Sequence, residues 1–183
     1  MNEQTCCFSG HRHLPKQETL HIHNLLVKHI LKLIHIGVNT FICGGALGFD
    51  TLAALAVLKI RSIYPHIQLI LALPSPQQTN GWSSNDIAVY QSILKQANQI
   101  IYMSQEHHSG CMHMRNHYMV DNSLYCICYL ANQTGGTAYT SAIRKKENRH
   151  ILILPMNHNL FENNIIRIIK GSHLIAAFYD KRF

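Results

Sequence analysis

This sequence lacks the features that assign a chain to a membrane, secreted or disordered class. No apolar run approaches the roughly 18 residues that a membrane-spanning helix needs. The first residues, MNEQTCCFSG, lack the basic start and long apolar stretch of a secretory signal. Internal repeats, low-complexity segments and an interdomain linker are also missing, and 47% of the residues are hydrophobic, as in an ordinary globular protein. We therefore expect a single domain over residues 1–183, in the cytoplasm and without a membrane partner.

The spacing of a metal site is missing as well. The six cysteines form no CxxC pair, which a zinc ribbon or thioredoxin-like motif would need. Most lie in or beside apolar runs such as TCCF and LYCICYL, where small buried thiols are common. His113 and His117 stand four residues apart, as two zinc ligands on a helix would, but the glutamate of a zincin helix is absent. We expect reduced core thiols, no metal and no cofactor.

Acidic residues are scarce. The chain has nine Asp and Glu and 16 Lys and Arg, which gives a formal net charge of +7. This balance suits nucleic acid or phosphorylated small molecules, and it also favours solubility alone. The one dense basic cluster comprises Arg144, Lys145, Lys146 and Arg149, near the end of an expected helix, where cations complement the helix dipole. With no aromatic-rich basic stripe, we do not expect duplex nucleic acid as a partner.

Strand-like and helical patterns alternate along the chain. Continuous apolar runs predict strands at residues 5–9, 39–43, 67–74, 99–103, 124–130 and 150–155. Helical spacing and alanine-rich composition predict helices over residues 17–36, 50–64, 86–97, 112–121 and 138–147, and around 160–170. This alternation predicts an α/β fold, a doubly wound and mostly parallel sheet with helices on both faces.

A glycine-rich turn follows the second expected strand, in the segment FICGGALGFD. Gly44, Gly45 and Gly48 are typical of a tight strand-to-helix turn, and also of a turn whose backbone N–H groups face a phosphate. The pattern is not GxGxxG, so alone it does not decide between the two. Asp50 could cap the following helix or accept hydrogen bonds from ribose hydroxyls.

Two further loops follow strands and carry similar chemistry, SGHR after the first and TGGTAY after the fifth. Right-handed connections in a parallel sheet place all three loops at one edge, where such sheets bind ligands. We therefore expect residues 9–12, 44–50 and 134–139 to surround one site for a nucleotide-like anion.

Phosphate would be held by several residues of these loops. Gly135, Gly136 and Thr137 are predicted to form a second backbone cradle. Arg12 has no acidic neighbour in sequence, which favours an anion partner or plain surface solvation. Arg115 is the strongest candidate, since a planar guanidinium donates two hydrogen bonds to phosphate.

Other residues are expected to contact the rest of the ligand. Asn116 could hydrogen-bond a base or sugar, and Trp82 or Tyr139 could stack on a base. Packing in the core or in a lid is the alternative for both aromatic residues. Gly10 and His11, in the SGHR loop, complete the predicted ligand-binding set.

Several segments together resemble a known family. They occur in the order FSGHR, CGGALGFDTLAALAV, YPHIQLILALP, the Trp82 loop, GCMHMRNHYMVDNS and GGTAYTSAIRKK. This set is similar to the YpsA-like branch of the SLOG superfamily, which includes DprA and the LOG ("lonely guy") enzymes, over nearly all of residues 5–155. The resemblance implies a Rossmann-like fold and a pocket for nucleotides or nucleotide-derived ligands. It also implies nucleotide sensing, as in defence systems, and leaves a homodimer open.

The chain departs from the LOG enzymes where they carry their catalytic residues. Those enzymes cut the N-glycosidic bond of nucleoside 5′-monophosphates and carry MHxRK followed by PGGxGTxEE. Here MHMRN keeps Arg115 and has Asn116 in place of lysine. Aligning the paired glycines puts Ser141 and Ala142 at the two glutamates, and neither can supply the carboxylate that such cleavage uses.

We therefore expect a binding module that senses or sequesters a nucleotide-derived small molecule without LOG-type turnover. The alternative is a hydrolase of nucleotide N-glycosidic bonds, with Asp50 or Asp121 as a substitute carboxylate. A more distant alternative is binding of single-stranded DNA, by analogy with the DprA branch, and the missing basic stripe counts against it.

Overall fold

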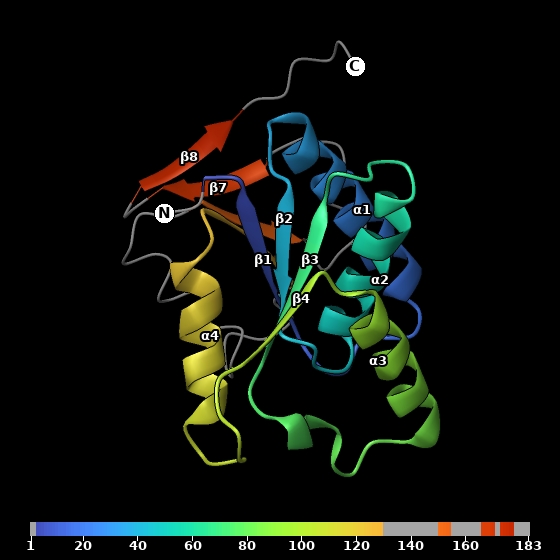
Figure 1. The fold of residues 1–183 in the computed structure, drawn as a ribbon. Coiled ribbons are helices and arrows are strands. Elements are labelled where there is room, and N and C mark those ends of the chain that lie inside the picture. Colours follow the sequence, from blue (N-terminus) through green and yellow to red (C-terminus); the bar gives the residue numbers. More distant parts are fainter. Residues whose placement is uncertain (1–2, 130–149, 155–165, 171–172, 178–183) are drawn as a thin grey trace.

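The computed structural model describes residues 3–129, 150–154, 166–170 and 173–177. Eight strands form one sheet in the order β4-β3-β2-β1-β5-β6-β7-β8 (Figure 1). The strands are β1 Thr5–Ser9, β2 Thr40–Cys43, β3 Gln68–Leu73, β4 Gln99–Tyr102, β5 Tyr125–Tyr129, β6 His150–Leu154, β7 Ile166–Lys170 and β8 His173–Ala177. Strands β1 to β6 are parallel, while β7 and β8 run antiparallel at one edge.

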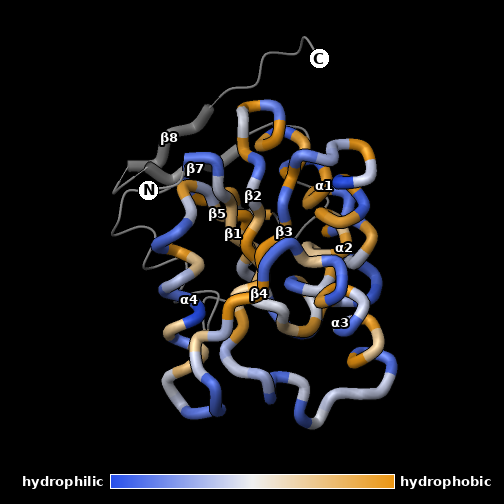
Figure 2. The backbone as a smooth tube through the Cα atoms, in the orientation of Figure 1, coloured by the Kyte–Doolittle hydropathy of each residue, from blue (hydrophilic) through white to orange (hydrophobic). Residues whose placement is uncertain are grey.

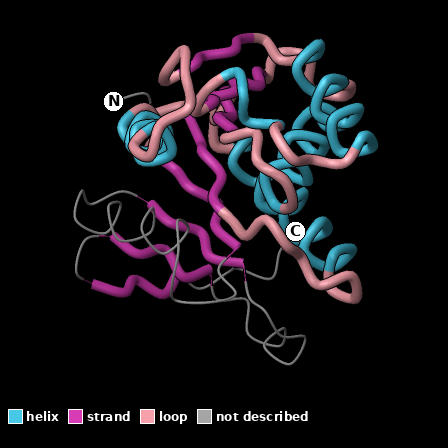
Figure 3. Tube along the Cα trace, turned by 90° about the horizontal axis from the view of Figure 1, so that it is seen from below, coloured by secondary structure: helices cyan, strands magenta, loops and turns pink. Residues whose placement is uncertain are grey.

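Helices cover both faces of this sheet, as the alternation of patterns predicted. The α-helices are α1 Thr19–His35, α2 Phe49–Arg61, α3 Ser84–Gln96 and α4 Cys111–Asp121, with a short 3-10 helix, η1 Pro76–Thr79, after β3. Figure 3 shows α4 on one side of the sheet and the other α-helices together on the opposite side. The doubly wound α/β architecture is therefore confirmed.

Side chains alternate between two apolar clusters on either side of the strands. Cys6 and Phe8 of β1 face the larger cluster, beneath α1 and α2, whereas Cys7 faces the smaller one, where Met119 of α4 packs. Central strands buried on both faces need apolar residues throughout, which is why these segments read as continuous runs. In Figure 2 the hydrophobic stretches of the backbone fall mainly along the central strands and on parts of α1 and α2.

All six cysteines are free and buried, which confirms the prediction of reduced core thiols. Cys126 and Cys128 point to the same face of β5, with their Sγ atoms 3.3 Å apart. Within the described ranges, no helix has the length and apolar character that crossing a bilayer would require.

The prediction of a final helix around residues 160–170 is wrong for residues 166–170, which are the part of it that the structure describes. Residues Ile166–Lys170 form strand β7, which pairs with β6 and β8. The spacing of its isoleucines suits either structure, but β-branched side chains prefer a pleated strand and β7 pairs with strands on both sides. The helix expected over 138–147 lies outside the described residues.

The strand order reverses beside β1. From β1 the chain moves outward through β2, β3 and β4, and then returns to place β5 on the other side of β1. In open parallel sheets the loops that leave the carboxyl ends of the two strands at such a reversal turn to opposite faces, and a crevice forms between them. A ligand site is therefore expected beside the segment that follows β1.

Candidate functional site

A pocket of about 410 Å³ lies where β1 ends. Its size falls in the usual range for small-molecule sites, roughly 300–1,000 Å³. The lining comes from the end of β1 and its loop, from the turn before α2, and from α4: Phe8, Ser9, Gly10, His11, Arg12, Ala46, Asp50, Met112, His113, Arg115, Asn116 and Met119. The first two predicted loops therefore meet at one site.

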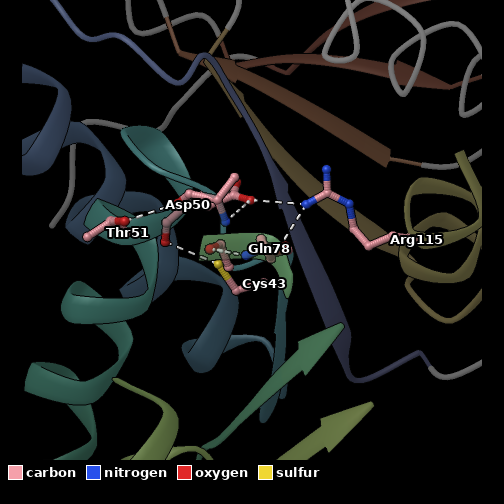
Figure 4. Close-up of polar contacts among 8 residues, drawn as sticks. Cys43, Asp50, Thr51, Gln78 and Arg115 are labelled. Carbon is pink, nitrogen blue, oxygen red and sulfur yellow. Dashed lines mark hydrogen bonds and ion pairs between the residues drawn. The ribbon is translucent and has the colours of Figure 1, made fainter. Parts of the chain in front are cut away.

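An ion pair crosses this pocket from α4 to α2. Arg115 Nη1 lies 3.5 Å from Asp50 Oδ2 and donates to the carbonyl of Gly44 at 2.9 Å. The two side chains are only 11% and 8% exposed. Figure 4 shows the guanidinium reaching from α4 toward Asp50. Two buried charges are stable only when they are paired and hydrogen-bonded. The pair therefore fixes the geometry of the pocket.

Asp50 is anchored within its own turn rather than acting as a helix cap. Its Oδ2 accepts the N–H of Ala46 at 3.2 Å, while Gly48 holds the N-cap position of α2. Burial raises the pKa of Asp50, and the charges of Arg115 and Arg12 and the Ala46 N–H act in the opposite direction. Asp50 therefore stands at the pocket as a buried carboxylate that accepts the N–H of Ala46 and pairs with Arg115.

Gly44 is a glycine because Arg115 and Asp50 occupy the space beside it. A Cβ at this position would collide with Arg115 Nη1 and would lie 2.7 Å from Asp50 Oδ2. No unusual backbone dihedral demands glycine here. The missing side chain makes room for the ion pair.

The other two glycines of the turn also pack against the protein itself. Gly48 has φ +74°, and a Cβ there would collide with the carbonyl of Arg12. Gly45 has φ +64°, and its carbonyl accepts a hydrogen bond of 2.5 Å from Gln78 Nε2. Because protein atoms surround all three glycines and none lines the pocket, the turn serves as a frame for Asp50 and Arg115.

Arg115 retains donors that the ion pair does not use. Its Nε is buried and has no hydrogen-bond partner among the residues that the structure describes, and both contacts to Gly44 and Asp50 use Nη1. A buried N–H without an acceptor costs about 1–3 kcal/mol. The Nε–Nη2 edge of a guanidinium is one of the edges that grip an oxyanion with two hydrogen bonds. An oxyanion in the pocket would complete the bonding of this side chain.

Helix α4 presents one continuous stripe to the pocket. Met112, Arg115, Asn116 and Met119 lie at spacings of three, four and seven residues, which is a single helical face. The prediction from the sequence includes only the two polar members. The helical spacing from Arg115 is the signal that could have found the methionines, and it places His113 at the edge of the same face.

The predicted site residues fall into three groups. Those lining the pocket are Gly10, His11, Arg12, Asp50, Arg115 and Asn116. Those described but not lining it are Gly44, Gly45, Gly48, Trp82 and Asp121. Those outside the described residues are Gly135, Gly136, Thr137 and Tyr139, together with the basic cluster at 144–149.

Trp82 packs against the core instead of facing the pocket. Its ring meets that of Tyr90 edge-on, with centroids 5.4 Å apart. Asp121 ends α4 and is exposed, away from the pocket lining. Within the residues that the structure describes, no three His, Cys, Asp or Glu side chains are grouped so that they could hold a metal ion.

The chain is similar to curated proteins whose functions are not stated in their names. It is 30% identical to the UPF0398 protein BH1768 of Halalkalibacterium halodurans over 66% of this chain and 65% of that protein. It is 31% identical to the SPbeta prophage-derived protein YoqJ of Bacillus subtilis over 53% of this chain and 64% of that protein. The matches therefore span slightly less than two thirds of these relatives.

Two solved structures share the fold. DNA processing protein A from Helicobacter pylori, described with a single-stranded DNA binding mode, gives a TM-score of 0.61 at 21% identity, covering 85% of this chain and 66% of that chain. The protein of the same name from Streptococcus pneumoniae gives a TM-score of 0.62 at 14% identity, covering 85% of this chain and 52% of that chain. These likenesses confirm the Rossmann-like fold.

The sequence model of the YpsA family, described as the YspA SLOG family, matches residues 10–158. That range begins at the first loop of the pocket and includes the glycine turn and all of α4. The chain therefore belongs to the YpsA family of SLOG proteins.

Proposed function

We propose that this protein binds a nucleotide or nucleotide-derived small molecule in the pocket after β1, and senses or sequesters it without cleaving it. The observation that carries the proposal is the buried Nε of Arg115, which has no partner within the described part of the chain, beside a pocket that holds a second guanidinium, Arg12. A phosphate oxygen is the acceptor that such a donor edge suits best.

The remainder of the lining supports a ligand with an apolar, planar part. Met112 and Met119 border the pocket along α4, and Phe8 borders it from β1. Thioether and aromatic groups pack favourably against flat rings such as bases. The amide of Asn116 lies between the two methionines along the helix and offers both a donor and an acceptor to the edge of a base.

Binding without turnover is supported by the carboxylates available. Asp50 is the sole carboxylate in the described lining, whereas cleavage of a glycosidic bond ordinarily uses a pair of carboxylates. Asp121 is exposed and outside the lining, so it no longer serves as a substitute acid. Incubation with nucleoside 5′-monophosphates should yield no free base and no ribose 5-phosphate by chromatography. Release that disappears in Asp50→Asn would establish the hydrolase instead.

The binding test compares two arginine-to-lysine variants by calorimetry with a panel of nucleoside 5′-monophosphates. Arg115→Lys keeps a cation beside Asp50 but removes the Nε–Nη2 fork, so we expect affinity to fall about 10- to 100-fold. Arg61→Lys is the matched control, since Arg61 bonds Asn98 and Gln96 at the far end of α2. Unchanged affinity in Arg115→Lys would remove Arg115 from the site.

Single-stranded DNA is the competing ligand class, because the Helicobacter pylori protein of similar fold is described with a single-stranded DNA binding mode. A DNA complex should weaken steeply with salt, because each phosphate contact releases counterions. Oligonucleotide binding that outcompetes every monophosphate and shows this salt dependence would favour DNA over the proposal.

A further inference from the structure

We infer that Asp50 selects ligands that carry hydroxyl groups close to the oxyanion, so that the pocket takes ribonucleotides in preference to their deoxy counterparts. This inference rests on the proposed function and names the sugar that the site would accept. It rests on the two carboxylate oxygens of Asp50, because the described residues bond to Oδ2 and not to Oδ1.

The residues described in the structure engage one oxygen of Asp50 and not the other. Oδ2 accepts from the Ala46 N–H at 3.2 Å and lies 3.5 Å from Arg115 Nη1. Oδ1 accepts nothing from the described residues, and it is not among their fully buried atoms that lack a partner. Because Asp50 lines the pocket, Oδ1 is the carboxylate oxygen that a ligand can reach.

The charge of Asp50 restricts what can approach that oxygen. A second phosphate or a carboxylate placed there would meet a like charge in a site of low dielectric, which is costly. A hydroxyl group instead donates a hydrogen bond to the carboxylate, in the strong charge-assisted class. The site therefore suits one oxyanion at Arg115 with a neutral donor beside it, and a sugar phosphate combines the two.

Both groups are held in place before any ligand arrives. The absent Cβ of Gly44 admits the ion pair, and the Ala46 N–H fixes the carboxylate. The turn is braced in its own right, because the Thr51 hydroxyl donates to the carbonyl of Ala46 at 3.0 Å. A rigid acceptor cannot move to compensate for a missing hydroxyl, and so it discriminates more strongly than a flexible one.

The decisive comparison uses calorimetry with the ribonucleoside 5′-monophosphate that binds best, its 2′-deoxy form and its 3′-deoxy form. We expect at least one deoxy form to bind about 10- to 100-fold more weakly to the wild-type protein, since a buried acceptor loses its donor. In Asp50→Asn, which keeps the shape but removes the charge, that ratio should fall to about threefold or less. Asp121→Asn, exposed on α4 and outside the lining, should keep the wild-type ratio.

Each outcome separates the inference from the proposed function. Equal affinity for the ribose and both deoxy forms would overturn the role of Asp50 and leave nucleotide binding in place. No binding of any monophosphate would overturn the proposed function and the inference together. If Asp50→Asn does not fold, as judged by its thermal unfolding, the three ligands on the wild-type protein still decide the question.

Discussion

The two faces of the sheet are built for different purposes. On one face α1, α2 and α3 enclose a large apolar core that includes Leu26 and Phe41. On the other face a single described helix, α4, packs on a smaller cluster and carries Arg115 to the pocket. The larger apolar core therefore lies on the three-helix face, whereas many of the side chains that line the pocket come from α4. Mutations on the two faces should therefore be separable by measuring both stability and affinity.

The largest effect on stability is expected from the core of the three-helix face. Leu26 is fully buried in α1, and Leu26→Ala should lower the free energy of unfolding by about 2–5 kcal/mol. Leu20→Ala in the same helix is the control, because Leu20 is 71% exposed. Urea unfolding measures both variants. A loss from Leu26→Ala no larger than that from Leu20→Ala would contradict the described packing.

His29, on the same face, should make stability depend on pH. Burial, together with Lys32 and Lys28, lowers the pKa of His29 to about 4 from 6.5. Between pH 6.5 and pH 4, His29 is protonated in the unfolded chain but stays neutral in the folded chain. The free energy of unfolding therefore decreases as the pH falls from 7 toward 4. We expect a loss of about 2–3 kcal/mol between these limits. Unfolding curves of His29→Gln should show a shallower pH dependence, and an unchanged slope would contradict the assignment.

On the ligand side, Gly44→Ala should act mainly on affinity. Its Cβ would displace Arg115 and Asp50, so we expect binding of nucleoside monophosphates to weaken about 10- to 100-fold. Gly110→Ala is a suitable control, since its Cβ would meet His108 at 3.4 Å, an ordinary contact distance, and no other described residue. Retained affinity in Gly44→Ala would show that the ion pair is not needed in its present geometry.

The smallest effect is expected at the start of α3, away from the pocket. The Ser83 hydroxyl accepts the N–H of Asp86 at 3.2 Å and so caps this helix. Ser83→Ala should cost about 1 kcal/mol of stability and leave ligand affinity unchanged. A change in affinity in this variant would show that the two properties are less separable than the comparison implies.

Much of the architecture was predictable because buried parallel strands leave a strong signal. The six parallel strands and helices α1 to α4 follow from apolar runs and helical spacing. Strand β7 was missed because closely spaced isoleucines fit a helix as well as a strand, and its pairing with β6 and β8 lies outside its own five residues. Propensity alone cannot supply such tertiary partners.

Two of the three loops expected to meet do line one pocket, whereas the contacts within it could be predicted only in part. Arg115 and Asp50 were identified from their residue types and from the loop arrangement, but nothing in the sequence indicates that they pair with each other across 65 positions. The glycines of the turn were interpreted as a phosphate cradle, whereas protein atoms surround them. The sequence prediction did not include Met112 and Met119, because apolar residues on a helix usually belong to the core.

The central claim is that Arg115 holds a phosphate-bearing ligand in the pocket after β1. It is tested most directly by mass spectrometry of small molecules released from the wild-type protein and from Arg115→Lys, both purified without added ligand. We expect a phosphate ester of a ribose compound to be released from the wild-type protein and to be strongly depleted in Arg115→Lys. Release of the same compound in equal amounts from both proteins, or of no phosphate-bearing compound from the wild type, would contradict it.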